Sequence, residues 1–251
     1  MVFRDQLDLV IFPEQQLVIE VTPEASSPAT TRDHLLVDQV LPRILSHEGR
    51  LVLHAGAVDR NGRSLIFVGE SGYGKSSLVA SFDQAGLRLI GDDALVISLE
   101  AGRCCAAAVY PSLRLFSDSI DAVLPAGSGA RPVSHYTSKL RVDLSQERSS
   151  EPDQPLPIEA IFILGGPGKG DKIKVRPMTV AETCISLIRN SFALDPTDTE
   201  IARKRLGEAS AMANQVPAYE ISYPHDYTRL AEVRQAIIAC LDEGTRQLSA
   251  Y

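Results

Sequence analysis

The strongest constraint on the fold of this chain is a short glycine-rich stretch at residues 69–76. Its sequence, G-E-S-G-Y-G-K-S, matches the pattern G-x-x-x-x-G-K-[ST] at every specified position. An apolar run at residues 65–68 precedes the stretch, and a helix-forming segment follows it over residues 75–84. Such loops bind phosphate when a buried strand precedes them and a helix follows. The sequence therefore predicts an α/β fold built around a P-loop.

The residue types in this loop suit phosphate binding. Glycine has no Cβ, so the chain can curl until its backbone N–H groups converge on phosphate oxygens. Lys75 would place a positive charge near the β- and γ-phosphates, and Ser76 would offer a hydroxyl to Mg²⁺ at the positive end of the helix dipole. A glycine turn that only joins a strand to a helix is the alternative. We expect ATP to be held by Gly69, Glu70, Ser71, Gly72, Tyr73, Gly74, Lys75, Ser76 and Ser77.

Two adjacent acidic residues, Asp92 and Asp93, follow the loop and its helix. A strand beginning at residue 87 beside the loop strand would carry both carboxylates to the edge of the sheet where the phosphates bind. One carboxylate could hold Mg²⁺ and the other could accept the proton of an attacking hydroxyl, and the sequence does not decide between them. Gly-Asp-Asp between two strands is also good turn chemistry, which is the structural alternative.

Residues 53–97 join three motifs in a fixed order. They are L-H-A-G-A-V-D around His54, the glycine loop, and G-L-R-L-I-G-D-D-A-L-V-I around the acidic pair. This segment resembles the C-terminal kinase core of the HPr kinase/phosphorylase family. Two further segments, Y-P-S-L-R-L at 110–115 and H-Y-T-S-K-L-R-V at 135–142, are similar to shorter HPr-kinase-related serine kinases, some of which phosphorylate lasso peptides.

The resemblance implies a nucleotide-binding core like that of HPr kinase and phosphoenolpyruvate carboxykinase, with a mixed sheet and flanking helices. It also implies that Ser76 and one of Asp92 and Asp93 serve Mg²⁺, that the other aspartate is the base, and that His54 assists near the transferred phosphate. Without the resemblance, a histidine in the apolar run 51–58 is more typical of a hydrogen-bonded core residue.

Three other cations are candidates for the site: Arg114, Lys139 and Arg141. Charge that develops on a transferred phosphoryl group needs neutralising by more than one lysine. The alternative is that these side chains are solvated surface residues.

The chain is expected to form a single kinase domain over residues 1–251. Residues 1–50 would hold a strand pair, 7–12 with 16–21, and a helix at 35–46. The P-loop core would span residues 51–245. In it, Asn61-Gly62 predicts a hairpin between strands 51–58 and 64–68. Strands at 87–90, 94–99 and 158–164 follow, and residues 173–175 would pair back onto the last of these. The remainder reads as helical, with a capping box at Thr179 and Glu182 and an amphipathic last helix.

Composition limits the classes of partner. The 25 basic and 32 acidic side chains leave a net charge of −7, which disfavours nucleic acid and anionic membranes as partners. We find no apolar run long enough to span a membrane and no secretory signal, so a cytoplasmic location is expected. Four cysteines match no zinc or C-x-x-C spacing and are interpreted as reduced core residues. Homo-oligomerisation is left open.

The favoured hypothesis is an ATP-dependent kinase that phosphorylates a serine of a peptide or protein, such as a lasso-type precursor. A small-molecule alcohol kinase is one alternative, and a nucleotide-gated regulatory protein with weak hydrolysis is another. The sequence does not identify the acceptor, because loops such as 125–138 and 145–157 would shape its binding site.

Overall fold

A mixed sheet forms the centre of the molecule in the computed structural model, which describes residues 2–3, 7–12, 17–21, 29–134, 137–142, 154–166 and 172–248. Its main path is β4 (Leu51–Leu53), β8 (Leu95–Glu100), β9 (Arg103–Ala108), β13 (Leu156–Leu164), β6 (Arg63–Val68), β5 (Ala55–Arg60) and β7 (Arg88–Gly91). Two further strands extend it, since β15 (Ala218–Ser222) pairs with β13 and β14 (Lys174–Pro177) pairs with β15.

Strand β13 joins the two halves of this sheet. Its first two residues pair antiparallel with β9, and from Ile158 onward the strand runs parallel to β6. Its last four residues also run parallel to β15. With partners along both edges, β13 reads as a nearly continuous apolar run, as expected for a buried central strand.

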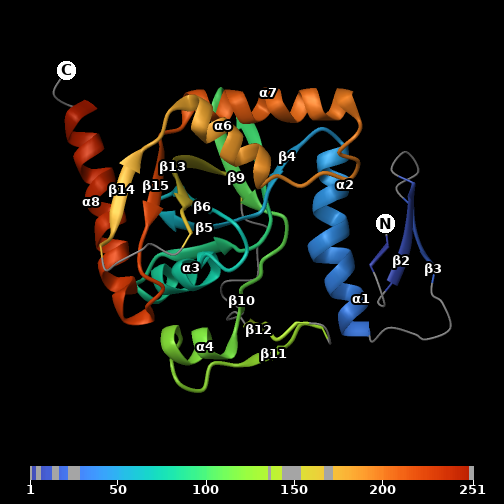
Figure 1. The fold of residues 1–251 in the computed structure, drawn as a ribbon, viewed down its shortest axis with the longest axis horizontal. Helices are drawn as coiled ribbons and strands as arrows, with labels where there is room; N and C mark the ends of the chain where they lie inside the picture. The colour runs from blue at the N-terminus through green and yellow to red at the C-terminus, as the bar shows by residue number, and fades with distance from the viewer. Residues whose placement is uncertain are drawn as a thin grey trace.

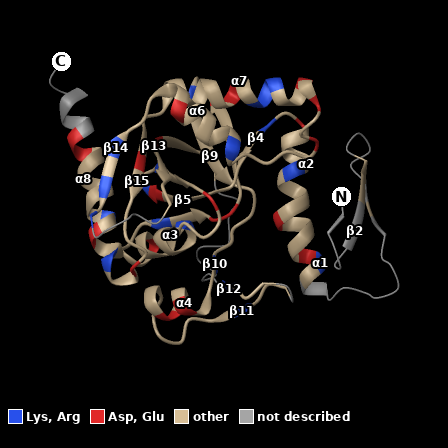
Figure 2. Cartoon of the chain, viewed as in Figure 1, with Lys and Arg blue, Asp and Glu red and all other residues tan. Residues whose placement is uncertain are grey.

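Helices cover both faces of the sheet (Figure 1). The side chains of β6 alternate between them, as the strand period of two requires. Leu65 and Phe67 pack with α3 (Lys75–Gln84) and α8 (Leu230–Leu248), whereas Ile66 and Val68 pack with α6 (Val180–Arg189) and α7 (Thr199–Gln215). Both α7 and α8 carry acidic and basic side chains along their length (Figure 2). Among the described helices, none is long and apolar enough to cross a bilayer.

Two smaller units flank the sheet. The N-terminal unit has β1 (Val2–Phe3), β2 (Leu7–Phe12) and β3 (Leu17–Val21), followed by a helical segment of α1 (Ala29–Leu35), the π-helix η2 (Leu36–Val40) and α2 (Leu41–His47). The second unit has β10 (Arg114–Leu115), α4 (Ser117–Val123), β11 (Ala130–Pro132) and β12 (Leu140–Val142). The 3-10 turn η3 (Tyr227–Arg229) leads into α8. The helical segment of the first unit and the strands of the second contribute residues to the site described below.

Several sequence expectations are confirmed. Asn61 and Gly62 have φ values of 55° and 80° and join β5 to β6 as an antiparallel hairpin. The capping box of Thr179 and Glu182 starts α6. Strands 87–90, 94–99 and 158–164 correspond to β7, β8 and β13. The last helix buries the four residues that define its apolar stripe, namely Leu230, Val233, Ile237 and Leu241.

Other expectations are wrong. The helix expected at 35–46 begins at Ala29, because Thr31 and His34 are buried and the extra turns pack inward. The run 51–58 is two strands that break at His54, since β4 pairs with β8 and β5 pairs with β6.

Residues 173–175 do not pair back onto β13. The strand β14 pairs instead with β15, which lies in the stretch expected to be helical, because β13 is already flanked by β6 and β15. The loop expected at 125–138 contains β11, and the one expected at 145–157 ends in the first residues of β13. Residues 135–136, 143–153 and 167–171 lie outside the described residues.

Gly56 of β5 lies where the sheet packs closely against α3 and the acidic pair. A Cβ at this position would lie 2.8 Å from Val79 Cγ2 and 3.1 Å from Asp92 Oδ1. We therefore expect Gly56→Ala to lower the free energy of unfolding by about 1–3 kcal/mol, measured by urea denaturation. Gly207→Ala on α7 is the matched control, because open space surrounds Gly207 and alanine favours a helix there. A Gly56→Ala protein as stable as the control would contradict this packing.

Candidate functional site

The glycine loop connects β6 to α3 at one end of the sheet, with β6 ending at Val68 and α3 beginning at Lys75. Gly74 caps the helix with a φ of 85°, and a Cβ there would lie 2.9 Å from the hydroxyl of Tyr223. Only glycine satisfies both the left-handed backbone and this close approach. The start of α3 thus presents free backbone N–H groups and the positive end of its dipole to the site, as an anion requires.

Lys75 is buried, and its ammonium group is held by the loop itself. The Nζ atom donates to the carbonyl oxygens of Gly69 at 2.6 Å and Glu70 at 3.1 Å. Burial lowers the pKa of Lys75, while the nearby Asp92 and Asp93 carboxylates oppose this shift. The ammonium group of Lys75 is therefore fixed by two carbonyls of the loop, and Lys75 itself is the first residue of α3.

Strand β7 carries the acidic pair to the same edge of the sheet as the loop. It pairs with β5 rather than with β6, so the expectation that it lies beside the loop strand is wrong. Because β5 is antiparallel to both β6 and β7, these two strands point the same way and end together. One intervening strand thus leaves Asp92 and Asp93 near the start of α3.

Asp92 is completely buried, and neither of its carboxylate oxygens has a hydrogen-bond partner of normal geometry among the described residues. Burial, followed by the charge of Asp93, raises the pKa of Asp92 to about 7. The Ser76 hydroxyl is close enough to oppose this rise. A buried carboxylate without a partner is costly, so this group is stabilised by keeping its proton or by binding a cation.

Asp93 is buried as well, but it is ion-paired. Arg114 Nε donates to Asp93 Oδ2 at 2.8 Å and Nη2 lies 2.6 Å from the same oxygen. Burial would raise the pKa of Asp93, yet Arg114, His54 and Lys139 outweigh it and lower the pKa below its ordinary value. The backbone of Asp93 has a φ of 75°, a conformation that aspartate tolerates at turns. The two adjacent aspartates therefore differ. Asp93 stays ionised, whereas Asp92 tends to keep its proton.

Arg114 also reaches the N-terminal helical segment, in contacts that the sequence analysis missed. Its Nη1 donates to Asp38 Oδ2 at 2.7 Å and approaches His34 Nδ1 at 2.9 Å, and His34 in turn contacts Asp38. Asp38 lies on the π-helix η2, a helix form frequent at functional sites. The spacing of His34 and Asp38, four residues apart, could have indicated a shared face. Nothing in the sequence links that face to Arg114.

His54 lies in the break between β4 and β5. Its backbone N–H donates to the carbonyl of Asn190 at 2.6 Å, and its Nδ1 lies 3.0 Å from the carbonyl oxygen of Asp93. This contact assigns the proton to Nδ1 and leaves Nε2 as an acceptor. Burial, then the charge of Lys75, lowers the pKa of His54 to about 4. The imidazole is consequently neutral at pH 7.

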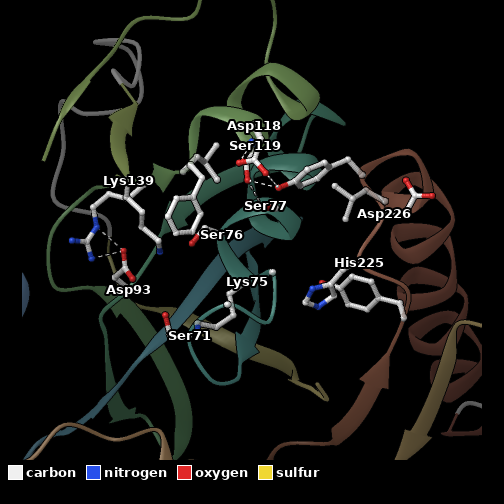
Figure 3. Close-up of a pocket in the computed structure, with 18 of the residues that line it drawn as sticks. Ser71, Lys75, Ser76, Ser77, Asp93, Asp118, Ser119, Lys139, His225 and Asp226 are labelled. Atoms are coloured by element: carbon white, nitrogen blue, oxygen red, sulfur yellow. Dashed lines mark hydrogen bonds and ion pairs between the residues drawn. The ribbon is translucent and has the colours of Figure 1, made fainter. Parts of the chain in front are cut away.

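A cavity of about 270 Å³ brings most of the expected site residues together (Figure 3). Lys139 and Asp93 lie on one side of Lys75 and Ser76, and His225 and Asp226 lie on the other. The expected residues on its wall are His54, Ser71, Gly72, Gly74, Lys75, Ser76, Ser77, Asp93, Arg114 and Lys139.

The remaining expected residues lie around this cavity rather than on its wall. Gly69 contributes the carbonyl that holds Lys75, and Tyr73 packs against the core beside α3. Arg141 does not line the cavity and instead lies 3.7 Å from Asp38. Sequence reasoning did not anticipate Phe116, Tyr223 and Tyr227, which also line this cavity.

The residues present fit a magnesium ion bound together with phosphates. No group of three or more metal-ligating side chains occurs within the described ranges, so the protein by itself offers no complete metal cage. Magnesium commonly takes one or two protein ligands and completes its coordination with phosphate oxygens and water. The Ser76 hydroxyl and the unpartnered Asp92 carboxylate provide such a partial set.

Comparisons with known proteins give a partial likeness to a solved structure. No protein-family model matches the chain, and no curated protein matches it. A solved structure, described as the Hpr(Ser) kinase/phosphatase from Coxiella burnetii, is 10% identical and has a TM-score of 0.42, covering 80% of this chain and 98% of its own. The function proposed below rests on the chain's own residues.

The raised pKa of Asp92 predicts a pH-dependent cost in stability. Between about pH 4 and pH 7 the folded protein keeps a proton that the unfolded chain loses, so this group lowers the free energy of unfolding as pH rises. Asp92→Asn removes the cost. We expect its melting temperature without magnesium to exceed that of the wild type by about 3 °C or more at pH 8, and by less at pH 5. The exposed Asp121→Asn control should show no such trend, and a pH-independent difference for Asp92→Asn would contradict the assignment.

Proposed function

We propose that this protein is an ATP-dependent kinase that transfers the γ-phosphate to a hydroxyl, with a serine of a peptide or protein as the acceptor. The observation that carries the proposal is the meeting of Lys75 and Ser76 with an acidic pair at the same edge of the sheet. Phosphoryl transfer needs positioned phosphates, a cation and a group that orients the attacking hydroxyl, and these residues supply each of them. A loop that only joined a strand to a helix would not require a buried, unpartnered carboxylate beside it.

The residues divide into three roles in this proposal. Backbone N–H groups of residues 69–77 and Lys75 would bind the phosphates, and Ser76 with Asp92 would hold Mg²⁺. The ion, when bound, neutralises charge on the β- and γ-phosphate oxygens. Asp93 would accept a hydrogen bond from the acceptor hydroxyl, because Arg114 keeps its carboxylate ionised.

Lys139 is the cation best placed to meet the developing charge. It lines the same cavity and lies 5.6 Å from the ring centre of Phe116, and no ion pair holds it among the described residues. Arg114, by contrast, is already committed to Asp93 and Asp38. Lys139 can therefore turn toward a phosphate without breaking a salt bridge.

A peptide serine is the acceptor favoured by the resemblance of residues 110–115 and 135–142 to short serine kinases, lasso peptide kinases among them. Residues 114–115 form β10 and residues 140–142 form β12, and these strands pair beside the cavity. The exposed strand β11 lies at the edge of the same small sheet and could pair with an extended acceptor chain.

Lys75→Met tests the phosphate-binding role. The change keeps most of the buried side-chain volume but removes the charge, so we expect ATP turnover to fall by about 100-fold or more with little loss of stability. Lys174→Met, at an exposed position on β14, is the matched control. Turnover would be measured by release or transfer of labelled γ-phosphate. Wild-type turnover in Lys75→Met would rule out the mechanism.

Separate replacement of the two aspartates distinguishes a kinase from a nucleotide-gated regulator. Asp93→Asn is expected to lower phosphoryl transfer by about 100-fold while the Kd for ATP stays within about threefold of wild type. Asp92→Asn is expected to weaken the magnesium dependence of ATP binding. The assay uses labelled ATP with a cell lysate and scores labelled protein against labelled metabolite. Tight ATP binding by the wild type with no labelled product would favour the regulator.

A further inference from the structure

A second cavity opens on the other side of the glycine loop. It has a volume of about 470 Å³, and its wall includes Arg43, His54, Ser71 and Phe192. A smaller cavity of about 320 Å³, lined by Asp93 and Arg114 among others, shares His54, Ser71 and Phe192 with it. His54 and Ser71 also line the cavity that holds Lys75 and Ser76. These three spaces therefore meet at His54 and Ser71.

The geometry of phosphoryl transfer favours a different ligand for each of these cavities. Lys75, Ser76 and Ser77 lie only on the wall of the first of them, together with Tyr223 and Tyr227, whose rings suit a nucleoside. In phosphoryl transfer the attacking and leaving oxygens lie roughly in line across the phosphorus. An acceptor must then approach from the side opposite ADP. The second cavity contains neither Lys75 nor Ser76 and adjoins the first at His54 and Ser71, so it offers the acceptor a separate space.

Arg43 supplies an uncompensated positive charge to this second cavity. Its Nη1 donates to the carbonyl oxygen of Gln39 at 2.7 Å and to Gln39 Oε1 at 2.9 Å, and its guanidinium lies 5.3 Å from the ring centre of Phe192. No carboxylate of the described residues lies within ion-pair distance of it. Burial lowers the pKa of Arg43, with no anion opposing the shift.

The acidic residues on the walls of these two cavities form no ion pair with Arg43 among the described residues. Glu70 is the acidic residue on the wall of the larger cavity, and it interacts with Tyr73, raising the pKa of that phenol. Asp38, on the wall of the smaller cavity, is paired with Arg114. The larger cavity therefore carries a free guanidinium beside the path to Asp93.

The wall under Arg43 is held in place by hydrogen bonds to the sheet. The Phe192 N–H donates to the carbonyl of Val52 at 2.9 Å, and the Phe192 carbonyl accepts from Ser46 Oγ at 2.7 Å. Arg43 thus stacks on a fixed ring, and less conformational entropy is lost when it binds an anion.

We propose that the acceptor carries a carboxylate or phosphate group near the reacting hydroxyl, and that Arg43 binds this group in the second cavity. This inference rests on the proposed kinase activity and adds the chemical class of its substrate. A planar guanidinium binds either anion through paired hydrogen bonds. The anion would anchor the acceptor while its hydroxyl reaches Asp93. An acidic peptide and a small hydroxy acid both offer this chemistry.

Binding of matched probes to the full chain tests the inference. The protein is saturated with Mg²⁺ and the non-hydrolysable analogue β,γ-imido-ATP, and Kd values are measured by ligand-observed NMR. One pair is the capped peptides Gly-Ser-Asp-Gly and Gly-Ser-Asn-Gly, and the other is glycerate and glycerol. We expect the anionic member of one pair to bind about tenfold or more tightly than its neutral partner. The pair that shows the preference identifies the source of the anion.

Variants assign the preference to Arg43. Arg43→Gln should reduce it to about twofold or less, and Arg43→Lys should keep part of it. Arg203→Gln, at an exposed position on α7, should keep all of it. No anionic preference in either pair, no binding of any probe, or a preference that survives in Arg43→Gln would overturn the inference. A wild-type protein that does not bind the ATP analogue would instead contradict the proposed function.

Discussion

The site depends on how the protein compensates buried carboxylates. Asp92 and Asp93 are adjacent and both buried, and two such charges cannot remain together unless cations or protons balance them. Arg114 balances Asp93, and it is itself shared with Asp38 of the N-terminal segment. Asp92 has no comparable partner among the residues that the structure describes. This difference in partners indicates different roles for the two aspartates. Their adjacent positions in the sequence do not predict that difference.

The topology of the sheet explains why these groups meet. Two parallel strands, β6 and β7, end at the same edge although β5 lies between them. The break at His54 lets the chain leave β8 and begin pairing with β6, which places an imidazole at this edge too. Each functional side chain thus sits at a strand end or a helix start, where the backbone fixes its position.

Local patterns in the sequence predicted much of this arrangement. The loop at 69–76, the Asn61-Gly62 turn and the capping box at Thr179 each depend on a few neighbouring residues, and each is present as expected. Pairings between distant segments were not predictable in this way. The partner of β14 and the strand β15 depend on which edges of β13 are free, which only the complete sheet determines.

The same distinction between local motifs and distant contacts applies to the candidate site. Lys75, Ser76 and the acidic pair were found because a motif brings them together in the sequence. Asp38 and Arg43 were missed because they lie on a helical segment. The residue pattern of that segment predicts only that one of its faces is buried. Their relevance comes from the side chains they face, Arg114 and Phe192, which are 76 and 149 positions further along the chain.

The contact between Asp38 and Arg114 changes where the candidate site begins in the sequence. Residues 51–100 form a motif module that contains the whole loop and the acidic pair. The counter-charge of Arg114 nevertheless comes from η2, well upstream of that module. A fragment starting at β4 would retain the loop and the acidic pair but lose the Asp38 partner of Arg114. The helical segment at residues 29–47 is thus an integral part of the site rather than an attachment to it.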